Sequence, residues 1–182
     1  KLVNKHGKYY LHIPVTYDVE ESNVSDICNV VGIDRGINFV VATYDSKNKS
    51  GFVSGKAMKQ KRANYSKLRK ELQMRQTSSS RRRIKAIGGR ENRWMQDINH
   101  QVSKALVKNN PKHTLFVLED LSGIRNATER VKTKDRYVSV SWSFYDLEQK
   151  LIYKAKQNQS SVIKVDPHYT SQCCPCCGHI EK

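Results

Sequence analysis

Residues 29 to 45 read NVVGIDRGINFVVATYD, two apolar, β-branched runs separated by a short polar turn. Such runs predict two consecutive strands, at about residues 30–34 and 39–44. A carboxylate, Asp34, ends the first run, and a buried carboxylate is costly unless it is paired or bound to a cation. A third strand, at residues 52–54, follows a polar turn. The sequence therefore predicts a three-stranded meander that carries an acid at the end of its first strand.

A second acidic strand end lies further along the chain. The segment HTLFVLEDL, residues 113–121, predicts a buried strand that ends in Glu119 and Asp120. If this strand neighbours the first one, Glu119 and Asp34 project from the same edge of the sheet. A divalent cation such as Mg²⁺ would relieve their repulsion. Because side chains alternate along a strand, only one of the two consecutive acids faces inward, and we favour Glu119 over Asp120.

Two interpretations of these acids stay open at this point. Acids on adjacent strands hold the ions of two-metal phosphodiester hydrolases. Acids at strand ends also cap loops or pair with arginine without any catalytic role, and Arg35 and Arg125 are candidate partners.

The charge of the chain is concentrated in one stretch. The net charge is +16, from 33 Lys and Arg against 17 Asp and Glu, and residues 56–93 alone contain fourteen Lys and Arg against two Glu. A field this positive favours a polyanionic partner such as nucleic acid, although a solvated basic surface is the alternative. The candidate nucleic-acid-binding residues are Arg62, Lys67, Arg69, Lys70, Arg75, Arg81, Arg82, Arg83, Lys85, Arg90 and Arg93.

Helical spacing in this region predicts a helical hairpin at residues 56–110. Tyr65, Leu68 and Leu72 follow the spacing of a first helix. Residues 76–90, rich in Ser and Gly, break that pattern and are expected to form the tip. A second helix follows, with its apolar face formed by Trp94, Ile98, Gln101, Val102, Ala105 and Leu106. Trp94 and Tyr65 could stack on bases, but residues at this spacing more often belong to the core.

The cysteines point to metal binding. Four of the five lie within the segment CCPCCG, residues 173–178, a pattern that indicates metal rather than a disulfide framework. Two registers of C-x-x-C overlap, Cys173 with Cys176 and Cys174 with Cys177. We favour Cys174 and Cys177 as Zn²⁺ ligands because Gly178 follows directly. A structural Zn²⁺ site needs four ligands, so the remaining two are expected beyond Lys182, with His179 as a weak substitute. A redox pair and unligated thiols are the alternatives.

The remaining segments complete an α/β pattern. Residues 8–20 alternate as a strand, residues 141–158 form an amphipathic helix, and residues 160–167 form a last strand. We expect residues 1–27 to end a preceding β domain, residues 28–168 to form the main domain, and residues 169–182 to form a metal-binding knuckle. The chain reads as a fragment of a longer protein.

Three motifs, VGIDRGINFVVAT, LEDLSGI and DPHYTSQCCPCCGH, together resemble the TnpB (OrfB) proteins of bacterial insertion sequences, which are related to compact type V CRISPR effector nucleases. The segment VSWSFYDLEQKLIYKA also resembles the helix before the zinc ribbon of that family. The resemblance follows the order and spacing of the motifs over most of the chain.

The resemblance implies an RNase H-like (RuvC) mixed sheet, with the basic hairpin inserted and a partial zinc ribbon at the end. It places two catalytic, Mg²⁺-binding acids on Asp34 and Glu119, and zinc ligands on Cys174 and Cys177. It implies a cytoplasmic, bacterial or archaeal DNA endonuclease that takes a guide RNA and a target DNA as partners. The hairpin would contact the phosphates of the guide–target duplex. The third acid and the second C-x-x-C of the family have no counterpart before Lys182, so the resemblance implies that this chain alone lacks part of the cutting site.

Two alternatives remain at the level of the sequence. One is a non-catalytic nucleic-acid-binding module that keeps the RNase H-like scaffold. The other is a transposase that joins DNA directly, a step for which the sequence has no specific feature.

Overall fold

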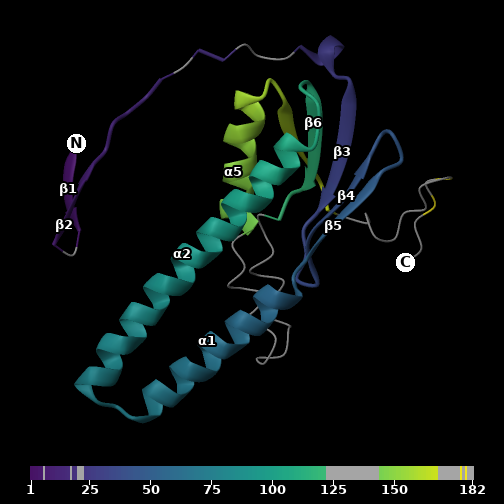
Figure 1. Cartoon of the computed structure of the whole chain (residues 1–182). Helices are drawn as coiled ribbons and strands as arrows, with labels where there is room; N and C mark the ends of the chain where they lie inside the picture. Colours follow the sequence, from purple (N-terminus) through teal and green to yellow (C-terminus); the bar gives the residue numbers. More distant parts are fainter. Residues whose placement is uncertain are drawn as a thin grey trace.

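The computed structural model describes residues 1–5, 7–16, 18–19, 23–121, 144–167, 177 and 179 of the chain. Its centre is a five-stranded sheet with the strand order β5-β4-β3-β6-β7. Two helices, α2 and α5, cover one face of this sheet, and α1 pairs with α2 as a long hairpin that runs out from the sheet (Figure 1).

The predicted meander is confirmed. Strands β3 (Asn29–Asp34), β4 (Phe39–Asp45) and β5 (Ser50–Ser54) pair as antiparallel neighbours. The bend into the next helix depends on Gly55, where an added Cβ would lie 2.2 Å from the backbone oxygen of Ile37. Gly55 therefore lets the end of β5 pass close to the turn between β3 and β4 before the chain enters α1.

Two further strands join the sheet in parallel with β3. Strand β6 (Thr114–Glu119) pairs with β3, and β7 (Ser161–Val165) pairs with β6. Parallel neighbours require crossover connections, which the helices provide. Helix α5 (Phe144–Gln157) lies between β6 and β7 in the sequence, as predicted.

The helical hairpin is also confirmed, but its tip is much shorter than predicted. Helix α1 spans Lys56–Met74 and α2 spans Ser78–Lys108. The prediction that residues 76–90 break the helix was wrong. Thr77 caps α2 by accepting a hydrogen bond from the Ser80 amide at 3.1 Å, so the serine-rich segment begins a helix instead of a loop.

The two glycines inside α2 do not interrupt it because packing outweighs their low helix propensity. Ile87 and Met95 are 4% and 5% exposed, so the helix is anchored on both sides of Gly88 and Gly89.

A correction also applies at the N-terminus. The predicted strand over residues 8–20 is only β2 (Lys8–Leu11), which pairs with β1 (Leu2–Lys5) in a separate two-stranded sheet. Gly7, with φ of 78°, lies in the bend between them. The register pairs Leu2 with Leu11, and the His12 amide donates to the Lys1 carbonyl at 2.8 Å, so the ladder uses all of β1.

The core lies between the sheet and its helices. Side chains alternate along β3 and β6, so that Val31, Ile33, Phe116 and Leu118 are buried under α2 and α5. The helices contribute Val102, Leu106, Leu147 and Leu151. In the described part of the chain, no helix is long and apolar enough to cross a membrane.

Candidate metal site on the open face of the sheet

Two carboxylates lie side by side at one edge of the open face. Strands β3 and β6 are parallel, and Ile33 is paired with Leu118 in their register. The next residue on each strand is Asp34 and Glu119. Because Ile33 and Leu118 point into the core, their successors point to the other face, on neighbouring strands about 4.8 Å apart. The predicted juxtaposition of the two acids is therefore present.

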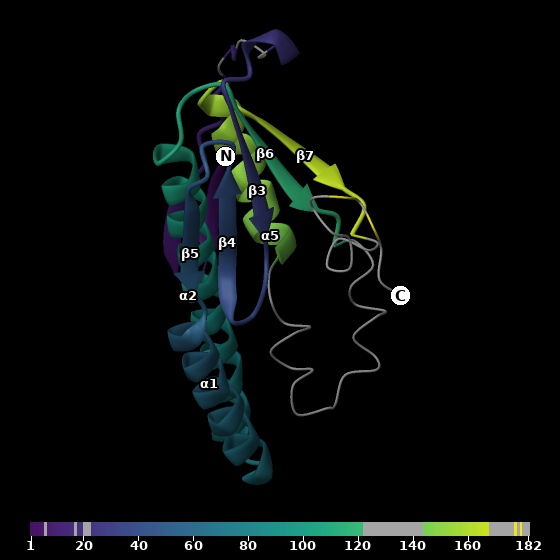
Figure 2. The ribbon, with the colours of Figure 1, turned by 90° about the vertical axis from the view of Figure 1, so that its right-hand side faces the viewer.

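Both acids border one hollow in the open face. The volume of this hollow is about 440 Å³. The small residues Gly32, Ala42 and Thr43 line part of it. Its other lining residues are Ile33, Asp34, Tyr44, Ser50, Phe52, Val117, Leu118, Glu119 and Val165. Figure 2 shows the sheet from this side, with the strands in front of the helices.

The neighbouring acid, Asp120, belongs to the other side of the sheet. Its Oδ1 lies 3.5 Å from the Nζ of Lys164, and the same amine lies 3.6 Å from Glu148 on α5. The structure therefore brings Glu119, and not Asp120, to the face of Asp34.

The non-catalytic interpretation of Asp34 requires that Arg35 pairs with it. The structure shows no such pair. The side chain of Arg35 turns to the covered face, where Nη1 donates to Glu148 Oε2 at 3.0 Å and to the Phe144 carbonyl at 3.4 Å. Its Nη2 donates to the backbone carbonyl of Glu119. Arg35 thus ties the end of β3 to the end of β6 and to α5.

This positioning role was missed by the reasoning from sequence. The signal available was an arginine directly after the acidic strand end, which the sequence analysis considered only as a partner of Asp34. Its real partner, Glu148, stands in the amphipathic helix among residues that predict a buried face. An acid on the buried face of that helix indicates a buried basic partner, and this signal was not used.

Asp34 is exposed and available to a ligand. Among the described residues its carboxylate makes no hydrogen bond or ion pair, in contrast to the buried Arg35 beside it. The described ranges contain no group of three or more His, Cys, Asp or Glu side chains that could hold a metal ion. The site in this chain is therefore a pair of hard oxygen donors. Arg125, the other candidate partner, lies outside the described residues.

The basic residues of the hairpin fall into two classes. Arg62 is 5% exposed and its Nε lies 3.3 Å from Oε1 of Glu91, which is itself 3% exposed. Arg69 pairs with the other oxygen of the same carboxylate. These two arginines hold α1 against α2. The exposed members of the predicted set are Lys67, Lys70, Arg75, Arg81, Arg82, Arg83, Lys85, Arg90 and Arg93.

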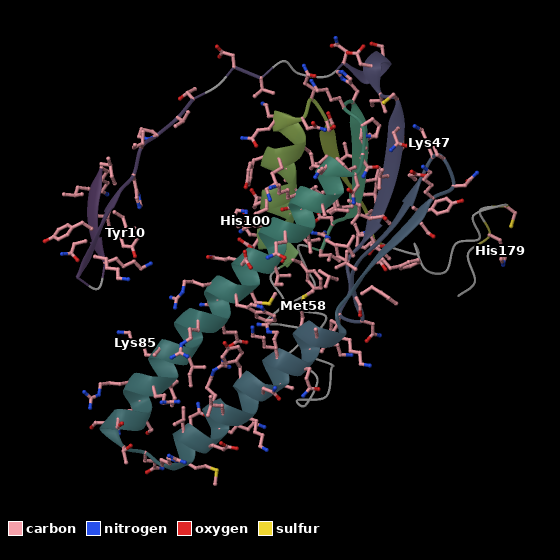
Figure 3. All side chains as sticks on the ribbon, viewed as in Figure 1. Tyr10, Lys47, Met58, Lys85, His100 and His179 are labelled. Carbon is pink, nitrogen blue, oxygen red and sulfur yellow. The ribbon has the colours of Figure 1, made fainter. Side chains whose placement is uncertain are left out.

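The exposed members lie along the outer surface of the hairpin. Lys85, for example, projects from α2 away from the sheet (Figure 3). Trp94 packs against the core, and the amine of Lys61 lies 4.4 Å from its ring centroid. The placement of Trp94 favours the core interpretation over base stacking.

The cysteine cluster is only partly described. Cys177 is exposed and forms no disulfide, and His179 is also exposed. Cys174, its predicted partner, and the alternative pair Cys173 and Cys176 lie outside the described residues.

Two family models match the chain. The model of a probable transposase, OrfB of IS605, matches residues 12–130, and the model of the Cas12f1-like TNB domain matches residues 144–182. The second match begins with α5, earlier than the predicted boundary at residue 169.

Similar proteins include nucleases. The CRISPR-associated endodeoxyribonuclease Cas12f1 of Syntrophomonas palmitatica is 30% identical, over 97% of this chain and 37% of the relative. A TnpB-like protein of Methanocaldococcus jannaschii is 31% identical, over 98% of this chain and 60% of the relative. The putative RNA-guided DNA endonuclease InsQ of Escherichia coli is 25% identical, over 97% of this chain and 46% of the relative. The chain thus spans about a third to three fifths of the length of these relatives.

The fold has solved counterparts. The cryo-EM structure of a Cas12f1-sgRNA-target DNA complex matches with a TM-score of 0.64 at 16% identity, over 91% of this chain and 42% of that one. The structure of a CRISPR-Cas12f ternary complex matches with a TM-score of 0.67, also at 16% identity, over 94% and 34%. At this identity the likeness concerns the fold. From the family model that covers residues 12–130, the chain belongs to the IS605 OrfB family of probable transposases.

Proposed function

We propose that this chain is the catalytic-core part of a transposon-encoded, RNA-guided, metal-dependent DNA endonuclease. The observation that supports this most directly is the pair Asp34 and Glu119, which stand side by side directly after the paired Ile33 and Leu118, on parallel strands and on the same open face. The family and the nuclease relatives supply the reaction class, and the mixed sheet supports an RNase H-like (RuvC) architecture.

The two acids fit a magnesium ion. Mg²⁺ is usually held by one or two carboxylates together with substrate phosphates, so a pair of acids on an exposed face suits it. When bound there, Mg²⁺ would activate a water molecule and neutralise charge on the phosphodiester. Asp34 supplies an unpaired oxygen donor, Glu119 supplies the second, and Arg35 fixes the backbone of both from the covered face.

The exposed basic residues of the α1–α2 hairpin would bind the phosphates of the guide RNA and the target DNA. Binding to phosphates needs only exposed cations, and the nine exposed Lys and Arg of the predicted set fulfil that condition. Arg62 and Arg69 take a different part in this proposal: paired with Glu91, they hold the two helices together. Cys174 and Cys177 would begin a structural Zn²⁺ site.

The test is cleavage of a DNA duplex matched to a supplied guide RNA, by the chain and by a longer protein that contains it. Asp34→Ala and Glu119→Gln should each abolish Mg²⁺-dependent cutting by the competent form while leaving nucleic-acid binding unchanged. Asp120→Asn is the matched control and should cut normally. Normal cutting by Asp34→Ala would contradict the proposal.

The second candidate is a non-catalytic nucleic-acid-binding module on the same scaffold. It is favoured by one observation, that the described residues bring only two acids together at the site. The same experiment separates the two, since a binding module binds DNA but does not cut it in either form.

A further inference from the structure

A second charged site lies on the helical side of the sheet, opposite the carboxylates. Helices α2 and α5 cover the same face of the sheet, and their C-terminal ends lie at the same end of it (Figure 1). Between these ends is a hollow of about 440 Å³. Its lining residues are Lys104, Val107 and Lys108 of α2, and Lys154, Gln157 and Asn158 at the end of α5.

Every charged side chain that lines this hollow is a lysine. Lys104 and Lys108 are one helical turn apart on α2, and Lys154 faces them from α5. Like charges at this spacing destabilise an isolated helix by a few tenths of a kcal/mol. Neither Lys104 nor Lys108 forms an ion pair with any of the described residues. The three amines thus share a concave surface with no acid in its lining.

Lys154 is held in place by the protein. Its Nζ donates to the carbonyl of His100 at 2.6 Å and to the hydroxyl of Ser103 at 2.7 Å. An ammonium group has three protons, so two are used in these bonds and one remains for a ligand. Burial lowers the pKa of Lys154, and the nearby Lys150 and Lys104 lower it further. An anion bound in the hollow would favour the charged form of Lys154 and so would raise its pKa again.

Cations near a helix C-terminus also have a simpler explanation. They interact favourably with the last carbonyls of the helix, by about 0.3 to 1 kcal/mol. That effect accounts for Lys108 and Lys154, which stand in the last turns, but it does not require that lysines of two helices line one hollow. Lys104 stands a turn earlier and gains little from it.

We propose that this hollow, formed by Lys104, Lys108 and Lys154, binds a backbone phosphate of nucleic acid on the side of the sheet away from the carboxylates. Two sources share this chemistry, an RNA strand and a DNA strand. The site relies on the proposed function only for the class of its partner, and it requires no catalysis. A non-catalytic binding module would use it equally.

The experiment measures the affinity of the chain for a fluorescent RNA duplex and for a DNA duplex of the same length, by anisotropy over a series of KCl concentrations. Each phosphate contact contributes about one unit to the slope of log affinity against log salt. Lys104→Gln/Lys108→Gln removes two of the three amines that hold this one phosphate, so it should lower the slope by about one. The matched control, Lys47→Gln/Lys49→Gln, removes two exposed lysines from the β4–β5 turn, and neither of them lines the hollow.

The outcomes distinguish the sources. If the double substitution lowers the slope for the RNA duplex only, the phosphate belongs to a guide strand. If it lowers the slope for the DNA duplex only, the phosphate belongs to the target. Equal loss with both indicates a site that accepts either backbone. If the pair in the hollow lowers neither slope by more than the control pair, the proposal is overturned, whatever the result of the cleavage assay.

A second measurement needs no substitution. Acylation of lysines, read by mass spectrometry, should be slowed by the bound duplex at Lys104, Lys108 and Lys154 but not at Lys47. Unchanged labelling of all three in the presence of saturating duplex would also overturn the proposal.

Discussion

The two faces of the central sheet are made by the same strands but have different tasks. On the covered face Ile33 and Phe116 are 5% and 0% exposed, in a core closed by α2 and α5. On the open face Phe52 is 63% exposed, beside a hollow bordered by two carboxylates. Because alternate residues of one strand belong to different faces, substitutions one position apart should separate stability from activity.

The largest effect is expected from Arg35→Met compared with Asp34→Asn. The Arg35 side chain is 1% exposed and the paired Glu148 side chain is 9% exposed, so the substitution leaves a buried carboxylate short of its main partner. We expect the free energy of unfolding to fall by about 3 kcal/mol or more, measured by urea denaturation. Asp34→Asn should change it by less than about 0.5 kcal/mol.

This comparison can fail in a definite way. Equal losses of unfolding free energy for the two variants would mean that the open face contributes to stability as much as the covered face does. Arg35 also holds the carbonyl of Glu119, so Arg35→Met should weaken metal binding at the open face as well.

A smaller effect is expected from pH on the helical side. Burial lowers the pKa of His100 below its ordinary 6.5, Lys150 and Lys154 lower it further, and Asp146 and Asp97 oppose them. The unfolded chain then binds the proton more tightly, so the free energy of unfolding falls as the pH drops through about 6.5. His100→Gln should remove this part of the pH dependence.

The measurement is urea unfolding of both proteins at several pH values on either side of 6.5. The difference should be small because His100 is exposed and water screens its charge. If the two proteins lose stability in parallel as the pH falls, the assignment to His100 is wrong.

Much of the fold could be predicted from the sequence because it depends on local patterns. The apolar, β-branched runs in residues 29–45 predicted the meander, and the apolar spacing around Trp94 and in α5 indicated amphipathic helices. The tip of the hairpin could not be placed, since the Thr77 cap and the packing around Ile87 outweigh two glycines.

The juxtaposition of the two acids could be predicted from the sequence, but the contacts that support it could not. Asp34 and Glu119 stand at strand ends, and a strand end is readable from sequence. The contacts of Arg35 with Glu148 and of Arg62 with Glu91 join residues 113 and 29 positions apart. Such pairs depend on how helices cross the sheet and each other, which no local pattern specifies.

The central claim is that Asp34 and Glu119 share one cation. Its most direct test is paramagnetic broadening of backbone amide NMR signals by Mn²⁺, a substitute for Mg²⁺, on the chain as it is. Broadening should centre on residues 32–34 and 117–119, disappear in Asp34→Asn/Glu119→Gln, and persist in Asp120→Asn. Broadening that is absent from these residues, or that survives the double substitution unchanged, would contradict the account.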